Sequence, residues 1–420
     1  MKSIVTALCV ASVLTVVIPF TSRADDASVP AGPTDWKKLY EDQKQRNDSL
    51  EKRLSLLEDK STQDVYVVKE KVPESTLKFL QQTEIDGYVS ASYFYNFNRP
   101  DDHLNLGRGF DARSDEFMAN KLVVRIGHPV EYSAFDWLAG YSAKLIFGQD
   151  AELTQAAGLS LGPQGDLFEA NLTVNVPIGS GLKVMLGKCG TPLGYESSFT
   201  EENFNWSGGN QWVFAEPFTH TGVMLSYQAT SELELKVMVM NGWDVVADNN
   251  HGKSVMGTAT YTYNDKLSMA LTGYGGPEQD ANTSNWRRGV DFWVDNKFSP
   301  KLEGVVQLDY GAEDGVDATG HRAEWFGLGG WLVYTFNDKW NVATRADYFK
   351  DGDGSRTSGA FTLPVGQNQE LCSVTLTVNF KPIEGLKLAP EFRWDHSSFD
   401  KAFVSRDTQV TLGFGAVYSY

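Results

Sequence analysis

Residues 408–420 read TQVTLGFGAVYSY, and apolar side chains occupy every second position of this stretch. The apolar row consists of Val410, Leu412, Phe414, Ala416, Tyr418 and Tyr420. The opposite row is mostly polar or small and includes Gln409, Thr411, Gly413, Gly415 and Ser419. A period of two is typical of a β-strand whose two faces meet different surroundings. The stretch therefore predicts a strand with one face in an apolar medium and the other in a polar one.

The same period recurs from residue 85 to the C-terminus. The expected strands are 85–97, 117–126, 137–147, 168–176, 182–188, 219–228, 233–241, 255–263, 267–274, 289–298, 302–311, 324–336, 340–349, 370–380, 386–394 and 408–420. Short turns such as 264–266 alternate with long polar loops such as 350–369. Tilted membrane strands of about 9 to 11 residues with this alternation of connections form barrels. We therefore expect an all-β fold, a transmembrane antiparallel up-and-down β-barrel of about 16 strands, rather than a soluble β-sandwich.

The barrel interior is expected to be polar. In the strand 302–311 an apolar row alternates with Glu303, Gln307 and Asp309, and the strand 386–394 alternates apolar residues with charged ones. Burying many charges in a dry core costs several kcal/mol each, on the order of the penalty for an unpaired ion. About sixteen strands also enclose a space wide enough for water. An aqueous lumen is therefore the simpler interpretation.

Composition limits the partners. The chain has 37 basic and 54 acidic residues and a net charge of -17, which argues against nucleic acid as a partner. It contains 24 Phe, 17 Tyr, 11 Trp and 39 Gly, yet its mean hydropathy is only -0.31. A chain that is aromatic but polar on average is typical of alternating membrane strands. The expected surroundings are outer-membrane lipid and lipopolysaccharide.

The N-terminal region predicts four segments. Lys2, an apolar run over 4–20 and the small residues around Ala24 predict a cleaved signal peptide at 1–24. Residues 25–34 form a linker rich in Pro and Gly. Residues 35–60 carry a 4,3 spacing that predicts a periplasmic helix in a coiled coil, with a solvated single helix as the alternative. Residues 61–84 form a tether to the barrel at 85–420.

The sequence contains no pattern for a metal or a cofactor. The two cysteines of the barrel, Cys189 and Cys372, predict no particular bridge. The histidines have no metal-ligand spacing, and residues 351–354 (DGDG) lack the later carboxylate of a calcium loop, so a turn is the better interpretation. We therefore expect no cofactor and no metal.

Seven short motifs carry a resemblance to a known family. They are 181–188 (GLKVMLGK), 191–196 (TPLGYE), 203–206 (NFNW), 217–222 (PFTHTG), 241–244 (NGWD), 273–278 (GYGGPE) and 390–395 (PEFRWD). Over 85–420 the chain resembles the OmpL-like β-barrel porin family. The resemblance implies a porin of the bacterial outer membrane that lets small hydrophilic solutes or ions diffuse passively, and it leaves the solute open. Tyr420 resembles the terminal aromatic assembly signal of such barrels, in which Phe is the usual residue.

The resemblance also implies a constriction inside the barrel. In porins of sixteen strands the third external loop folds into the channel, which here is the loop 189–217. The residues expected to face the pore from this loop are Glu196, Glu201, Glu202, Asn203, Asn205, Trp206, Asn210, Trp212 and Glu216. The residues expected on the lumen wall are Arg125, Lys183, Lys188, Arg345, Lys387, Glu391 and Arg393. A solvated surface lid is the alternative for the loop, and its two tryptophans predict either a strip for sugars or simple packing.

Two functions of other classes stay open. A structural outer-membrane anchor would have a plugged barrel and would use the coiled coil to hold a partner. An outer-membrane hydrolase would need a His and a Ser aligned on neighbouring strands, and the expected registers give no such pair. No enzymatic activity is therefore expected. The porin resemblance and the coiled coil both suggest a homo-trimer, with a monomer as the alternative.

Overall fold

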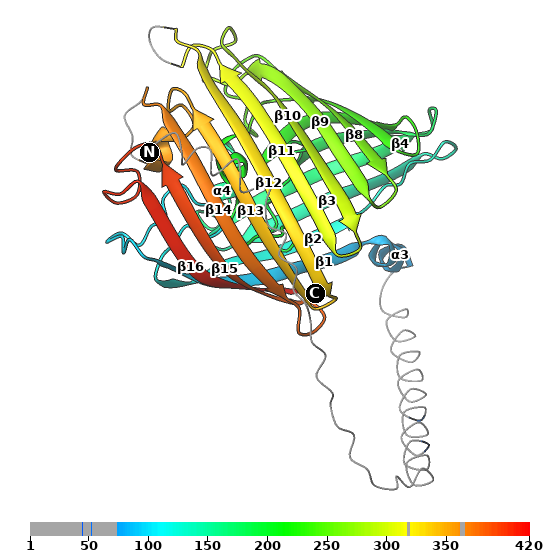
Figure 1. Cartoon of the computed structure of the whole chain (residues 1–420). Helices are drawn as coiled ribbons and strands as arrows, with labels where there is room; N and C mark the ends of the chain where they lie inside the picture. The colour runs from blue at the N-terminus through cyan, green and yellow to red at the C-terminus, as the bar shows by residue number, and fades with distance from the viewer. Residues whose placement is uncertain (1–43, 45–51, 53–73, 317–319, 362–365) are drawn as a thin grey trace. The chain divides into compact units, whose positions relative to one another are not determined.

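The structure of the chain is a computed structural model that describes residues 44, 52, 74–316, 320–361 and 366–420. Sixteen strands form a closed antiparallel barrel in which each strand pairs with its neighbours in sequence (Figure 1). The barrel closes where β1 (Glu84–Asn96) pairs with β16 (Thr408–Ser419), in a register that joins Tyr88 to Ser419. The predicted all-β barrel of sixteen strands is confirmed.

The other strands follow the predicted order along the chain. They are β2 (Glu116–His128), β3 (Leu138–Phe147), β4 (Gly165–Val176), β5 (Leu182–Gly190), β6 (Thr219–Gln228), β7 (Leu233–Met240), β8 (Ser254–Tyr263), β9 (Leu267–Pro277), β10 (Trp286–Ser299), β11 (Leu302–Glu313), β12 (Ala323–Asn337), β13 (Trp340–Asp351), β14 (Gln369–Phe380) and β15 (Leu386–Ser397). Several strands extend by two or three residues into the long loops, as β10 and β15 do. The ladder of backbone hydrogen bonds continues past the last alternating side chain, which is why the pattern underestimates the strand length.

The two faces of the strands have the expected character. On β11, Leu308 is 40% exposed on the outer face, whereas the next residue, Asp309, is 4% exposed on the inner face. The outer face of β16 likewise exposes Leu412 and Phe414. An apolar belt of this kind is stable in contact with hydrocarbon and unfavourable in water.

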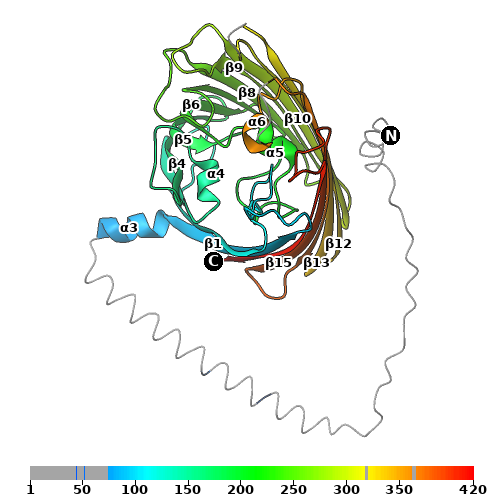
Figure 2. The same ribbon diagram turned by 90° about the vertical axis from the view of Figure 1, so that its left-hand side faces the viewer.

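Part of the connection between β5 and β6 lies inside the barrel. This connection, residues 191–218, is called loop L3 below, and it contains the short helix α5 (Asn210–Phe214). In Figure 2 the barrel is seen nearly along its axis, and α5 lies within the ring of strands. Two further short helices, α4 (Ala151–Thr154) and α6 (Ser358–Phe361), belong to other long loops. Ala151 of α4 lies in a buried cluster with Phe199 and Trp206 of L3, and Phe361 of α6 lies in a second one with Phe214.

The segments before the barrel are described only in part. The predicted signal peptide, linker and coiled coil at 1–24, 25–34 and 35–60 lie outside the described residues, except for Lys44 and Lys52, which are helical. Helix α3 (Glu74–Gln82) occupies the end of the predicted tether and belongs to a unit separate from the barrel. Of the helices that the structure describes, none is both long enough and apolar enough to span a bilayer. Cys189 and Cys372 are buried on β5 and β14, and no disulfide joins them.

Candidate functional site

Loop L3 is fixed to the inner face of β13 by a buried arginine. Arg345 Nη1 donates hydrogen bonds to Glu196 Oε1 over 2.6 Å and to the carbonyl oxygen of Ser207 over 2.5 Å. The Glu196 carboxylate in turn accepts a bond from the backbone N–H of Gly209 over 2.6 Å. One guanidinium therefore neutralises an acid of the loop and also satisfies its backbone, which a buried polar chain requires.

Two charged residues of β15 hold the next part of the loop. The Glu391 carboxylate accepts bonds from the backbone N–H groups of Trp206, over 2.7 Å, and Ser207, over 3.1 Å. Arg393 Nη1 donates to the carbonyl oxygen of Gly208 over 2.6 Å. Side chains of the wall thus satisfy the backbone polar groups of the buried segment 206–208.

These contacts correct one expectation about the lumen wall. Arg345, Glu391 and Arg393 point inward as predicted, but their side chains are buried beneath L3 and do not face an aqueous bore. Lys188 was also expected on the wall, and it is buried in an ion pair of 3.2 Å with Asp166. These four residues therefore lie on the wall, but they do not have the expected aqueous surroundings, because each one pairs with buried polar groups that would otherwise be unsatisfied.

Helix α5 continues the attachment of L3. The side-chain amide of Asn210 donates to Asp347 Oδ1 on β13, and that of Gln211 donates to Asp309 Oδ2 on β11, each over 2.5 Å. Asn205 is buried as well and donates to Thr377 Oγ1 over 2.7 Å. The predicted pore-facing positions Asn205 and Asn210 therefore anchor the loop instead.

The two loop tryptophans pack within the protein. Trp206 is 1% exposed, and its indole N–H donates to the carbonyl oxygen of Phe110 over 3.3 Å. Trp212 is 2% exposed, with ring centroids 4.6 Å from Phe110 and 4.8 Å from Phe218. The prediction of a sugar strip is wrong for these two residues, because neither ring presents a face to solvent. The alternative of simple packing describes them.

The acidic turn at residues 201–203 behaves differently, because it stays partly in contact with solvent. Arg125 forms ion pairs with Glu201 and, at 3.2 Å, with Glu202, whose side chain is half exposed. Lys387 Nζ donates to the carbonyl oxygen of Glu201 over 3.2 Å, and Asn203 holds the turn by bonding to the backbone of Ser197. Burial raises the pKa of Glu201, and the nearby Arg125 opposes this shift.

One cavity lies between L3 and the wall that starts at β3, and a second lies farther along the same wall. The first, of about 280 Å³, is lined by Lys144 and Glu169 of the wall and by Glu196, Ser197 and Glu202 of the loop. The second, of about 290 Å³, shares Glu169 and is lined by Tyr132, Lys183, Glu234 and Lys236. The two cavities follow one another along the wall formed by β3 to β7. Loop L3 therefore leaves open space beside this wall.

The charged residues of this free side were not all expected. Lys183 was predicted to line the lumen, and its ammonium lies 3.9 Å from the ring centroid of Tyr132. Lys144 and Glu169, which form an ion pair of 3.0 Å, were missed. Their inward direction follows from alternation along β3 and β4, but the register shifts next to Lys144, which obscures the pattern.

The terminal residue closes the barrel seam. The backbone N–H of Tyr420 donates to the carbonyl oxygen of Gly87 over 3.0 Å, and its phenol O–H donates to that of Val123 over 3.3 Å. Tyr420 thus contacts both of the first two strands.

Comparison with known proteins agrees with this architecture. Residues 82–420 match the family model described as "Putative beta-barrel porin-2, OmpL-like". No curated protein sequence matches the chain. Among solved structures, OprB of Pseudomonas putida has a TM-score of 0.55 at 10% identity and covers 83% of this chain and 96% of its own.

Two other solved structures are similar to the same extent. The outer membrane channel DcaP of Acinetobacter baumannii has a TM-score of 0.53 at 14% identity, over 80% of this chain and 97% of its own. An anion-selective porin from Comamonas acidovorans has a TM-score of 0.53 at 10% identity, over 80% of this chain and 99% of its own. At such identities the likeness shows the fold alone.

Proposed function

Because this chain belongs to the OmpL-like β-barrel porin family of the bacterial outer membrane, we propose that solutes cross its barrel along the free face of L3. The proposed route runs between this loop and the wall formed by β3 to β7. Its cargo is small hydrophilic solutes or ions, which move by passive diffusion. The family is one of porins, so no catalytic step is proposed.

One observation carries this proposal, namely that L3 is attached on one side. Its hydrogen bonds to Arg345, Glu391 and Arg393 cover β13 and β15. Its other side borders the first cavity, which is polar and is lined by Lys144 and Glu169, and the second cavity adjoins the first through the shared Glu169. A passage in a porin needs polar walls, because an apolar constriction of this size excludes water.

The charges along the proposed route can select among solutes. Glu202 projects from the loop, and Lys144 and Lys183 project from the wall. Charged groups that face one another across the route create an electric field, which orients water and favours solutes with a matching charge or dipole. Lys144 is proposed to attract anions, and Glu202 to attract cations.

Current measurements across planar bilayers test this route. The Lys144→Gln variant should shift the reversal potential in a salt gradient toward cation preference, and Glu202→Gln should shift it toward anion preference. Lys266→Gln is the matched control, because Lys266 is exposed in a short turn outside the route. Reversal potentials that agree among all three variants would show that the ions take another path.

The plugged anchor is the second candidate, because much of L3 is buried against the wall. Folded protein that gives no conductance steps, and no swelling of liposomes in sugars or amino acids, would favour the anchor. Cross-linking in native membranes would test the proposed homo-trimer, since a monomer gives no band of higher mass.

A further inference from the structure

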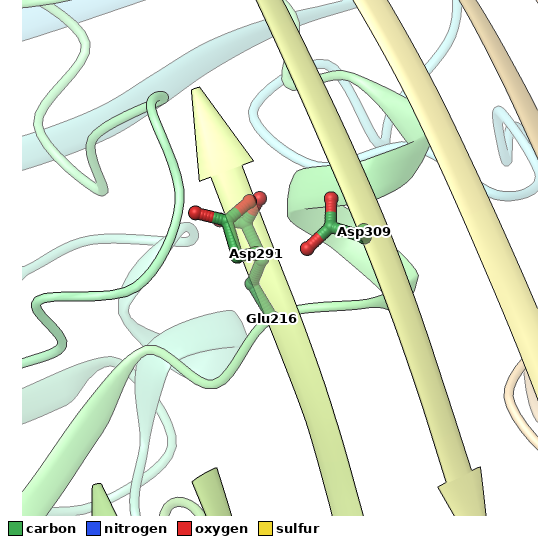
Figure 3. A group of neighbouring side chains, drawn as sticks. All are labelled: Glu216, Asp291 and Asp309. Atoms are coloured by element: carbon green, nitrogen blue, oxygen red, sulfur yellow. The ribbon is translucent and has the colours of Figure 1, made fainter. Parts of the chain in front are cut away.

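Three carboxylates meet where the end of L3 reaches the barrel wall. Glu216 comes from L3, Asp291 from β10 and Asp309 from β11, and one oxygen of each lies within 4.8 Å of the others. Asp291 and Asp309 are direct partners in the register of the two strands. Figure 3 shows the three carboxyl groups side by side, with Glu216 reaching up to the strands from the loop. All three residues are buried.

The negative charge of this cluster has no cationic partner among the residues that the structure describes. In the described part of the chain, no ion pair of a Lys, Arg or His involves Glu216, Asp291 or Asp309. Glu216 is 3% exposed, and its Oε2 atom accepts no hydrogen bond. An unpartnered carboxylate oxygen at this depth is unfavourable unless a proton or a metal ion compensates its charge.

The side-chain amides of Gln211 and Gln307 reach the cluster, but neither carries a positive charge that could supply that compensation. Gln307 Nε2 lies 2.6 Å from Glu216 Oε1, 2.8 Å from Asp291 Oδ2 and 3.3 Å from Asp309 Oδ2. An NH2 group has two protons, so it cannot donate fully to three acceptors. The two ends of a Gln amide are assigned from their surroundings, and a rotated Gln307 would direct its carbonyl oxygen at the same point.

The loop backbone is shaped around Glu216. Gly194 of L3 has a φ of +92°, and a Cβ atom at this position would lie 1.9 Å from Glu216 Oε2. Its backbone N–H donates to Asp291 Oδ1 over 3.3 Å. A residue other than glycine would push the Glu216 carboxylate away from its two neighbours.

We propose that Glu216, Asp291 and Asp309 bind one divalent cation of the calcium type, which joins the end of L3 to β10 and β11. Carboxylate and amide oxygens are the ligands that Ca²⁺ prefers, and its flexible coordination fits a site built from a loop and two strands. Gln307 in its rotated form supplies the amide oxygen. The cation replaces the missing positive charge and fixes the loop at this point, as Arg345 does on β13.

Terbium luminescence tests the site directly, because Tb³⁺ occupies calcium sites and emits when a nearby tryptophan is excited. Trp293 lies two positions from Asp291 on β10 and can serve as the donor. The full-length barrel in detergent should bind one Tb³⁺ per chain with saturation, and Ca²⁺ should displace it. Binding that does not saturate, or a signal that Ca²⁺ leaves unchanged, would overturn the proposal. This readout does not depend on conductance.

Variants assign the ion to these residues. Glu216→Gln and Asp309→Asn should each lose most of the saturable signal, while Glu202→Gln, an acid of the same loop outside the cluster, should keep it. The shift in mobility on heating in detergent gels verifies that each variant is folded. A folded Glu216→Gln or Asp309→Asn protein with wild-type binding would show that the cluster is compensated by shared protons instead.

Discussion

Arg345 on β13 and Glu196 in L3 form a hydrogen-bonded ion pair of 2.6 Å, and both side chains are almost completely buried. The pair joins the wall to the loop at the middle of the barrel. Because the same guanidinium bonds to the backbone of Ser207, its loss would affect both the charge balance and the loop conformation.

Removal of this arginine should therefore loosen L3. Arg345→Met leaves Glu196 as an uncompensated buried charge, for which a loss of about 3 to 5 kcal/mol in the free energy of unfolding is typical. Urea unfolding followed by tryptophan fluorescence measures the loss. Arg322→Met is the matched control, because Arg322 forms an exposed ion pair of 3.3 Å with Glu324 and should contribute less than about 1 kcal/mol. Equal losses in both variants would contradict the anchoring role.

The packing of Trp206 depends on a strand glycine. A Cβ atom at Gly415 on β16 would lie 2.1 Å from Trp206 Cε3. Gly415→Ala should destabilise the barrel by about 1 to 3 kcal/mol, the usual range for overpacking, and should alter tryptophan fluorescence. Gly273→Ala is the control, since no atom lies within 4 Å of the Cβ position there. A Gly415→Ala protein as stable as this control would show that Trp206 moves freely.

The stability of the barrel should depend on pH through Asp244, which lies in the loop after β7. Burial raises the pKa of Asp244 from 3.8 to about 6, although the backbone N–H groups of Phe218 and Thr219 donate to its carboxylate. At a pH between these two pKa values, the Asp244 carboxyl holds a proton in the folded chain that it has released in the unfolded chain. The stabilising contribution is therefore complete below the lower value and is lost as the pH rises through about 6.

Unfolding at a series of pH values tests this expectation. Asp244→Asn keeps the accepting oxygen and tolerates the left-handed backbone of this position, so it should remove up to about 1.4 kcal/mol per pH unit from the slope. Asp338→Asn, an exposed change in a short turn, should leave the slope intact. An Asp244→Asn slope that matches the wild-type slope would assign the pH dependence to other groups.

Tyr420 should matter for assembly more than for the final stability. Its phenol is partly exposed, and its backbone bond to Gly87 needs no side chain. Tyr420→Phe should keep the yield of assembled barrel, whereas Tyr420→Ser should lower it, if an aromatic terminus serves as the assembly signal. The fraction of heat-modifiable protein in isolated membranes gives the yield. An unchanged yield in Tyr420→Ser would show that the aromatic side chain is not an assembly signal.

The strands could be predicted from the sequence because the alternation of neighbouring residues is enough to identify each one. Leu308 and Asp309 are adjacent, and their opposite character alone predicts opposite faces of a sheet. The position of L3 came from the family resemblance, which supplies the ordinal number of the inserted loop. Local pattern and family together thus predicted the barrel and the loop that enters it.

The contents of the lumen could not be read in the same way. Alternation predicts that Arg345 points inward, but it does not tell whether water or protein lies in front of the guanidinium. Glu216, Asp291 and Asp309 come from three separate segments, so no spacing in the sequence predicts that they lie together. At Lys188 the preceding Gly187 has a φ of +135°, which breaks the alternation locally.

The bond between Trp206 and Glu391 spans 185 residues of the chain, and it has a kinetic consequence. The loop can reach its final position only after β15 has joined the barrel, because its bonding partner does not exist in place before then. Contacts of such long sequence separation form slowly. The wall should consequently be complete while L3 is still docking, and a late folding phase should report on the tryptophans of this loop.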